Sequence, residues 1–196
     1  MRKLLFGNQL STKRAVTRER EKERGDQTKK LFLLVTMLVG LMAFLLPAQA
    51  TIISWGLDYE FSGATPPEGT APWLTATVDD GDSSGNVTLT MDAVSLTDAE
   101  HVKVWFFNLD PLLDLSKLAI TYSSGSSANT ALGDDAFTAL GDGYFDIAFD
   151  FPDSGDARFQ AGEPSVWDIT LDGITAASFD FASATGIWIR QPISEA

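Results

Sequence analysis

The segment HVKVWFFNLDP, residues 101–111, is the longest run of β-branched and aromatic residues after the N-terminal fifty. A strand here would have no polar face, so we expect a buried central strand covered on both sides by other layers. Asp110 and Pro111 should end it, because proline removes a ladder donor and aspartate favours turns. Alternation would place Val102, Val104 and Phe106 on one face and Trp105, Phe107 and Leu109 on the other.

Shorter stretches alternate apolar and polar residues, which is the pattern of strands with one face in a core and one in water. The clearest is YFDIAFDF, residues 144–151, which should bury Phe and Ile side chains and expose Asp146, Ala148 and Asp150. Residues 123–130 and 152–162 are predicted to be loops by composition. The other predicted strands are residues 55–61, 73–78, 86–91, 118–122, 167–171, 177–181 and 187–189.

Residues 73–78 and 86–91 should form a hairpin across an acidic loop. About nine or ten short strands roughly ten residues apart, with little helix, are typical of an all-β fold. We therefore predict an antiparallel β-sandwich over residues 51–196, preceded by an N-terminal signal helix.

Residues 31–46, LFLLVTMLVGLMAFLL, follow two lysines and precede the sequence Pro-Ala-Gln-Ala. This is the order of a secretory signal peptide over residues 31–50, with cleavage between Ala50 and Thr51. A membrane anchor formed by residues 31–46 is the alternative, although a spanning helix needs roughly 20 apolar residues. Residues 1–30 are basic overall and without apolar periodicity, which predicts a disordered extension or a start assigned upstream of the true one.

The balance of charge also changes at residue 50, where the predicted signal peptide ends. Residues 1–50 carry ten Lys/Arg and four Asp/Glu, a balance of +6, whereas residues 51–196 carry four Lys/Arg and 23 Asp/Glu, a balance of −19. The acidic residues 51–196 should repel nucleic acid and anionic lipid. We therefore expect contact with a membrane only through an uncleaved leader. Extracellular polysaccharide and other surface proteins remain as partners. The chain has no cysteine, which excludes disulfides and thiolate chemistry.

The motifs WFFNLDP, GYFDIAFDFP and AGEPSVWDI lie within a stretch from Tyr59 to about Gly186 that resembles a family of secreted bacterial proteins. That family ends in the PEP-CTERM sorting signal. The resemblance implies an exported protein of the cell surface or extracellular matrix, and it implies no known activity. The sequence after Gly186 reads IWIRQPISEA, without Pro-Glu-Pro, an apolar helix or an arginine cluster. We therefore expect either a freely released member or a shortened reading frame.

The acidic loop after residue 78 is the candidate metal site. Asp79, Asp80 and Asp82 supply the carboxylates that calcium prefers. With Asp80 as the first position of a calcium loop, the twelfth is Met91 instead of the bidentate glutamate. A solvated acidic turn is therefore favoured over a calcium site, and no other cofactor is expected.

Carbohydrate binding is a second possibility, because exposed tryptophans on a β-sandwich can stack on sugar rings. Trp105 and Trp167 lie in strand patterns that predict burial, so Trp73 and Trp188 are the candidate ligand-binding residues. Core packing is nevertheless the favoured interpretation for them, because aromatic residues dominate cores.

Catalysis has little support in the sequence. His101 is the single histidine, which excludes a multi-histidine metal site. A carboxylate pair could serve glycoside hydrolysis, although solubilising charges on strand surfaces are the favoured interpretation. The carboxylates concerned are those of Asp146, Asp150, Asp168, Asp172 and Asp180.

Three hypotheses follow. The favoured one is a non-enzymatic exported structural or matrix protein with no catalytic residues. The alternatives are a carbohydrate-binding module and an uncharacterised hydrolase.

Overall fold

The computed structural model describes residues 29, 49–59, 65–81, 83–97, 100–139, 143–182, 189–190 and 193–194. Internal contacts divide the chain into two units, Met1–Pro47 and Ala48–Ala196. All described residues but one belong to the second unit. The predicted signal helix therefore lies outside the described residues, and so does nearly all of the basic extension.

The described part of the second unit is all-β, and every strand pair in it is antiparallel. Between residues 49 and 182 the described helical elements are two short 3-10 helices, η2 (Leu115–Lys117) and η3 (Ala176–Phe179). The strands are β1 (Ile52–Leu57), β2 (Leu74–Asp79), β3 (Asn86–Asp92), β4 (His101–Val102), β5 (Val104–Phe107), β6 (Ala119–Gly125), β7 (Asn129–Thr138), β8 (Tyr144–Asp150), β9 (Phe159–Gln160), β10 (Pro164–Thr170), β11 (Ile189–Arg190) and β12 (Ile193–Ser194).

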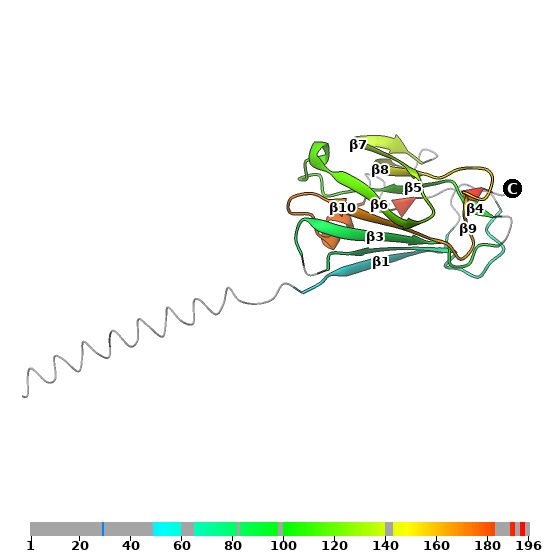
Figure 1. Cartoon of the computed structure of the whole chain (residues 1–196), viewed down its shortest axis with the longest axis horizontal. Helices are drawn as coiled ribbons and strands as arrows, with labels where there is room; N and C mark the ends of the chain where they lie inside the picture. The colour runs from blue at the N-terminus through cyan, green and yellow to red at the C-terminus, as the bar shows by residue number, and fades with distance from the viewer. Residues whose placement is uncertain are drawn as a thin grey trace, which may run out of the picture. The chain divides into compact units, whose positions relative to one another are not determined.

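These strands form three sheets. The largest has the order β1-β2-β3-β10-β6, the second has the order β11-β5-β8-β7, and a small sheet has the order β12-β4-β9. The predicted hairpin is confirmed, because β2 pairs with β3 and places Val78 opposite Leu89. β6 and β7 are consecutive in the chain but belong to different sheets, so their connection crosses from one sheet to the other (Figure 1).

Buried side chains from the five-stranded and four-stranded sheets meet in one core. The alternating apolar residues of β2, β3 and β10 contribute from one sheet, and β5 and β8 contribute from the other. The ring centroids of Phe149 on β8 and Trp167 on β10 lie 5.1 Å apart, so the sheets are in direct side-chain contact. Fully buried aromatic side chains make this core the main source of apolar stabilisation.

The predicted central strand is confirmed for β5, which lies between β11 and β8 and is buried on both faces. Trp105 and Phe107 enter the main core, while Phe106 belongs to a second cluster with Phe145. The expected single strand is wrong, however, because it is interrupted at Lys103, and β4 joins the small sheet.

The interruption changes which face the preceding residue occupies. Val102 lies in the main core and does not share the cluster of Val104 and Phe106, as strict alternation would require. Lys103 is exposed at this point, and its Nζ lies 2.8 Å from Asp153 Oδ2.

The prediction of one wet face for residues 144–151 is wrong. Asp146 and Ala148 of β8 are buried, at 7% and 6% exposed. Ala148 packs in the cluster of Phe106 and Phe145, and Asp146 accepts backbone hydrogen bonds. Both faces of β8 are therefore covered, and Asp150 is the one expected outward residue that is exposed.

Residues 177–181 were expected to form a strand, and this is also wrong. η3 occupies residues 176–179, with Ala176, Ser178 and Phe179 buried. The Thr175 amide donates to Ser178 Oγ at 3.1 Å, and the Ser178 amide donates to the Thr175 carbonyl at 3.0 Å. This local capping competes with a strand ladder and favours the helical turn.

Two further boundaries differ from expectation. β1 ends at Leu57, and Tyr59 is 79% exposed, so the first strand lies earlier than residues 55–61. Much of the polar stretch 123–130 is strand, because β6 continues to Gly125 and β7 begins at Asn129. Strand pairing uses backbone groups, so exposed Ser and Thr side chains do not prevent it.

No helix among the described residues is long and apolar enough to cross a membrane.

Candidate functional site

A hollow of about 830 Å3 lies at the connection between β5 and β6. It is bounded by the connection with η2, by the irregular middle of β7, and by the residues that follow η3. Its lining carries an amide and five carboxylates, those of Asn108, Asp110, Asp114, Asp134, Asp135 and Asp146.

Asp146 is the buried member of this lining. Its Oδ2 accepts the Leu109 amide at 2.9 Å, and its Oδ1 accepts the Asp135 amide at 3.0 Å. Burial raises the pKa of the Asp146 carboxyl, whereas these two amides lower it and the charges of Asp135 and Asp134 raise it further. Asp146 therefore holds the β5–β6 connection and the middle of β7 against β8.

The irregular middle of β7 explains how Asp135 reaches Asp146. Leu132 pairs with Ile147, but the next pair joins Phe137 to Phe145, so β7 carries extra residues between them. Within that insertion Asp135 has a φ of 47°, in the left-handed region. A bulge of this kind commonly redirects side chains and backbone at a functional surface.

The surroundings of Asp114 shift its pKa in the opposite direction from that of Asp146. Its Oδ2 lies 2.8 Å from Lys117 Nζ, and its Oδ1 accepts from the Ser116 hydroxyl at 2.6 Å. Hydrogen bonds from Lys117 and Ser116 lower the pKa of Asp114 to about 2. One hollow therefore contains a carboxyl with a raised pKa and a carboxylate that stays ionised.

This arrangement favours binding of polyhydroxylated or cationic molecules. Carboxylates accept hydrogen bonds from hydroxyl groups, side-chain amides both accept and donate them, and ionised carboxylates attract cations. Phe181 adds an aromatic side chain to the lining. Glycoside hydrolases also use two carboxyls with opposite pKa shifts. Here, however, both oxygens of Asp146 already accept hydrogen bonds from backbone amides.

The proposed calcium loop has a different arrangement. Asp80 is 6% exposed, and its two oxygens accept the Thr51 amide at 2.7 Å and the Ala176 amide at 3.3 Å. Asp79 Oδ1 accepts the Gly81 amide at 2.9 Å, and Asp82 lies outside the described residues. The description of this turn as wholly solvated is therefore wrong, because Asp80 is a buried structural carboxylate.

No group of three or more His, Cys, Asp or Glu side chains within the described ranges could hold a metal ion. Calcium binding at Asp79, Asp80 and Asp82 stays a prediction.

Of the two candidate tryptophans, Trp73 alone lies among the described residues. Trp73 is 9% exposed, and its Nε1 donates to the Gly69 carbonyl at 2.8 Å. The favoured interpretation of Trp73 as a core residue is therefore confirmed, and its buried ring presents no open face to a sugar. Trp188 lies outside the described residues.

The remaining strand carboxylates do not join Asp146 at the hollow. Asp168 is half-buried and accepts from the Thr88 hydroxyl at 3.2 Å on the neighbouring strand. Asp150, Asp172 and Asp180 are exposed. Of the five carboxylates considered for hydrolysis, Asp146 alone lines the hollow.

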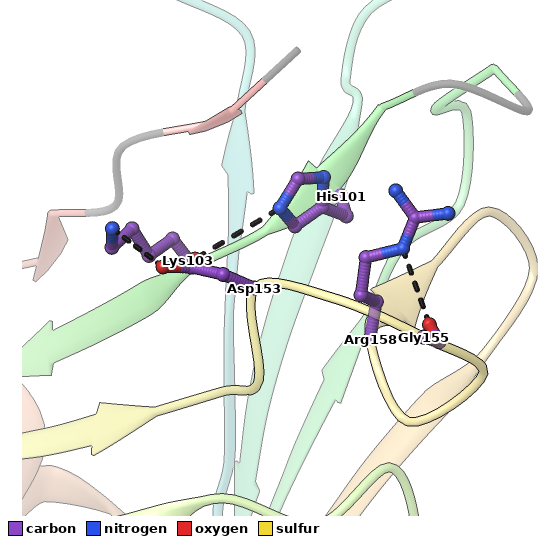
Figure 2. Close-up of polar contacts among 5 residues, drawn as sticks. All are labelled: His101, Lys103, Asp153, Gly155 and Arg158. Carbon is purple, nitrogen blue, oxygen red and sulfur yellow. Dashed lines mark hydrogen bonds and ion pairs between the residues drawn. The ribbon is translucent and has the colours of Figure 1, made fainter. Parts of the chain in front are cut away.

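His101 lies in a second polar cluster, where residues 153–158 approach β4 (Figure 2). Its ring is buried, with Nε2 4.0 Å from Asp153 Oδ1, and Lys103 contacts the other oxygen of Asp153. Arg158 Nε donates to the Gly155 carbonyl at 3.3 Å and shapes the same connection. These contacts hold the loop of residues 153–158 against β4.

Sequence reasoning missed most of the hollow. The sequence pattern uses Asp110 only as the end of the central strand, and Asp114, Asp134 and Asp135 are not among the candidate site residues. The signal that could have found them is the recurrence of paired acidic residues in two connections, DPLLD and GDD. Their meeting depends on strand pairing that neither segment specifies alone.

Comparisons with family models, with curated proteins and with solved structures found no match to this chain.

Proposed function

We propose that this protein is an exported, non-enzymatic β-sandwich protein of the cell surface or extracellular matrix. The observation that carries the proposal is the position of the cleavage site relative to the fold. Gln49, Ala50 and Thr51 are exposed and outside regular structure, and β1 begins at Ile52. A signal peptidase would therefore find an accessible bond directly before the first strand, and no strand would be cut.

The sandwich assignment is supported by the shared core. Two antiparallel sheets contribute buried residues to one cluster, and Phe149 contacts Trp167 between them. The fold has no disulfide to depend on, since the chain lacks cysteine, and its core aromatics supply stability instead.

The resemblance to secreted PEP-CTERM proteins supports the same location. A free extracellular product is the form we propose, and anchoring by residues 31–46 is the alternative. The strongly acidic mature part, with a balance of −19, favours contact with polysaccharide or with surface proteins over nucleic acid.

Carbohydrate binding is the second candidate function, and the hollow lined by carboxylates favours it. The volume of about 830 Å3 lies within the usual range of small-molecule sites. Asp110 and Asp134 would hydrogen-bond sugar hydroxyls, and Phe181 would supply apolar contact.

N-terminal sequencing of the exported product tests the main proposal. We expect the sequence to begin at Thr51, because the small residues Ala48 and Ala50 precede the bond. Recovery of the full-length chain in membranes would contradict release and support the anchor.

A glycan array with the exported protein separates the second candidate from the first. Binding that is lost in Asp134→Ala but kept in Asp156→Ala would establish a glycan site at the hollow, since Asp156 lies outside it. Turnover of a glycan that is abolished by Asp146→Asn, in a variant that still folds, would instead establish the hydrolase.

A further inference from the structure

The start of β1 is held by a buried carboxylate. The Thr51 amide nitrogen lies 2.7 Å from Asp80 Oδ1, and the Asp80 amide donates back to the Thr51 carbonyl at 3.2 Å. Thr51 is exposed, whereas Asp80 is 6% exposed. The buried Asp80 carboxylate therefore contacts Thr51, which is the residue directly after the expected cleavage site.

Asp80 also joins this point to a distant part of the chain. Its Oδ2 accepts the Ala176 amide at 3.3 Å, at the first residue of η3. One carboxylate thus connects the beginning of β1, the end of β2 and the beginning of η3. In the uncleaved chain its buried negative charge faces two neutral amides, and no cation is among the partners found for its oxygens within the described residues.

We propose that Asp80 is the receptor for the new N-terminus: after cleavage, the Thr51 α-ammonium forms an ion pair with the Asp80 carboxylate. This deepens the proposed function and rests on it. Peptidase-catalysed hydrolysis adds one water across the Ala50–Thr51 bond, leaving a carboxylate on Ala50 and an amine on Thr51 that takes up a proton at neutral pH. The same nitrogen then carries a positive charge and three hydrogens.

The geometry suits the charged form without rearrangement. A separation of 2.7 Å is typical of an ammonium-carboxylate hydrogen bond. A buried carboxylate gains from a compensating cation, because desolvation penalises an unpaired charge. Cleavage would therefore stabilise the junction of β1, β2 and η3 in the exported protein and would leave it weaker in the precursor.

The other charged groups on the elements meeting here are acidic. Asp79 is paired in register with Ile52 across β1 and β2, and Asp172 and Asp180 flank η3. All three would favour an ammonium at Thr51 through general attraction. A variant that removes the charge of Asp80 alone is needed to separate direct pairing from this background.

The test uses the full chain, expressed in a bacterial host and recovered after export. Mass spectrometry of the intact protein first identifies the N-terminal residue. Trace acetylation over a range of pH then measures the reactivity of the Thr51 α-amine, in the folded protein and in the same protein unfolded in urea. An ordinary α-amine has a pKa of about 7.7–8.0, and each unit of increase slows acetylation below that pH about tenfold.

We expect acetylation at neutral pH to be at least about tenfold slower in the folded protein, with the pH midpoint displaced upward. Asp80→Asn should return the midpoint toward the unfolded value, and Asp79→Asn should leave it near wild type. The pH midpoint separates pairing from simple shielding, which slows the reaction at every pH. If Asp80→Asn does not fold, an upward displacement in the folded wild type that persists in Asp79→Asn, Asp172→Asn and Asp180→Asn supports direct pairing, because none of those three carboxylates then accounts for it. A displacement lost in any of these variants overturns the ion pair.

A chain that begins at Thr51 but has the same midpoint when folded and unfolded overturns the ion pair and leaves the export proposal standing. A midpoint that Asp80→Asn does not move also overturns it. An exported chain that begins at a residue other than Thr51 overturns the ion pair alone, whereas a full-length chain recovered in membranes overturns both proposals, so the two failures are distinguishable.

Discussion

Among the described residues, three acidic side chains are buried, each against backbone amides from separate segments. Asp80 receives amides at residues 51 and 176, and Asp146 receives amides at residues 109 and 135. Glu100, 3% exposed, receives the Glu68 amide at 2.8 Å and the Thr97 amide at 2.7 Å. A carboxylate offers several acceptor positions, so one side chain can satisfy amides that no strand ladder serves.

Glu100→Ala should lower the free energy of unfolding by about 3 kcal/mol, because two amides would lose their acceptor in a buried setting. The matched control is Glu68→Ala, which removes the same charge from an exposed side chain and should change stability by about 0.5 kcal/mol or less. Denaturant unfolding of both variants measures the difference. Equal losses would contradict a structural role for the Glu100 carboxylate.

Asp146 should titrate above the ordinary aspartate pKa of 3.8, because burial disfavours its charged form. A raised pKa in the folded state means that the fold holds the proton more tightly than the unfolded chain. The stability contributed by this protonation is fully present below pH 3.8 and is lost as pH rises through the folded pKa. Carboxyl-carbon NMR titration measures the pKa directly, and a value at or below 3.8 would contradict the prediction.

At the scale of the elements, β10 is the strand around which the larger sheet closes. It pairs with β3 on one side and with β6 on the other, and the β6 register shifts between Val166 and Trp167. At the end of that ladder Gly125 lies opposite Ser165 and carries a φ of +85°. A Cβ at Gly125 would lie 2.0 Å from the Pro164 carbonyl oxygen, so the backbones approach too closely for any side chain.

Gly125→Ala should therefore destabilise the protein more than Gly155→Ala. Gly155 also has a positive φ, of +78°, but nothing lies within 4 Å of a Cβ there. Left-handed strain of about 1–2 kcal/mol is common to both substitutions, and the backbone clash is added at Gly125 alone. Thermal melting of the two variants compares them. An equal decrease would show that the approach of β6 to β10 relaxes at little cost.

At the scale of the whole molecule, charge is the dominant surface property. Residues 51–196 have 23 acidic and four basic side chains. Lys103 pairs with Asp153 and Lys117 with Asp114, and four basic side chains are too few to pair with most of the 23 acidic ones. Like charges at this density repel one another in the folded state, and salt reduces that repulsion.

The melting temperature of the domain formed by residues 51–196 should therefore rise with ionic strength. Calcium and magnesium chloride at equal concentration should raise it equally, since screening does not distinguish them. A specific calcium site would instead add about 2.7 kcal/mol at a hundredfold excess over its dissociation constant. A rise with calcium alone that is lost in Asp79→Asn would establish the loop after β2 as a calcium site and contradict plain screening.

Local pattern was sufficient wherever a residue's environment depends on its immediate neighbours. Alternation in residues 73–78 and 86–91 predicted the β2–β3 hairpin, and the apolar run around Trp105 predicted an interior strand covered on both faces. The chain by itself thus determined the all-β class and the main core strands, because backbone periodicity controls which side chains share a face.

Tertiary structure alone decided the roles of the polar residues. Asp146 has the pattern of an outward strand residue, and it is buried because the bulge of β7 and the chain at Leu109 bring amides to it. Asp80 has the pattern of a solvated turn, yet it binds the backbone of a segment 96 residues away in the sequence. The physical reason is that an acceptor's environment is set by which donors reach it, and those donors come from strands whose pairing local sequence does not encode.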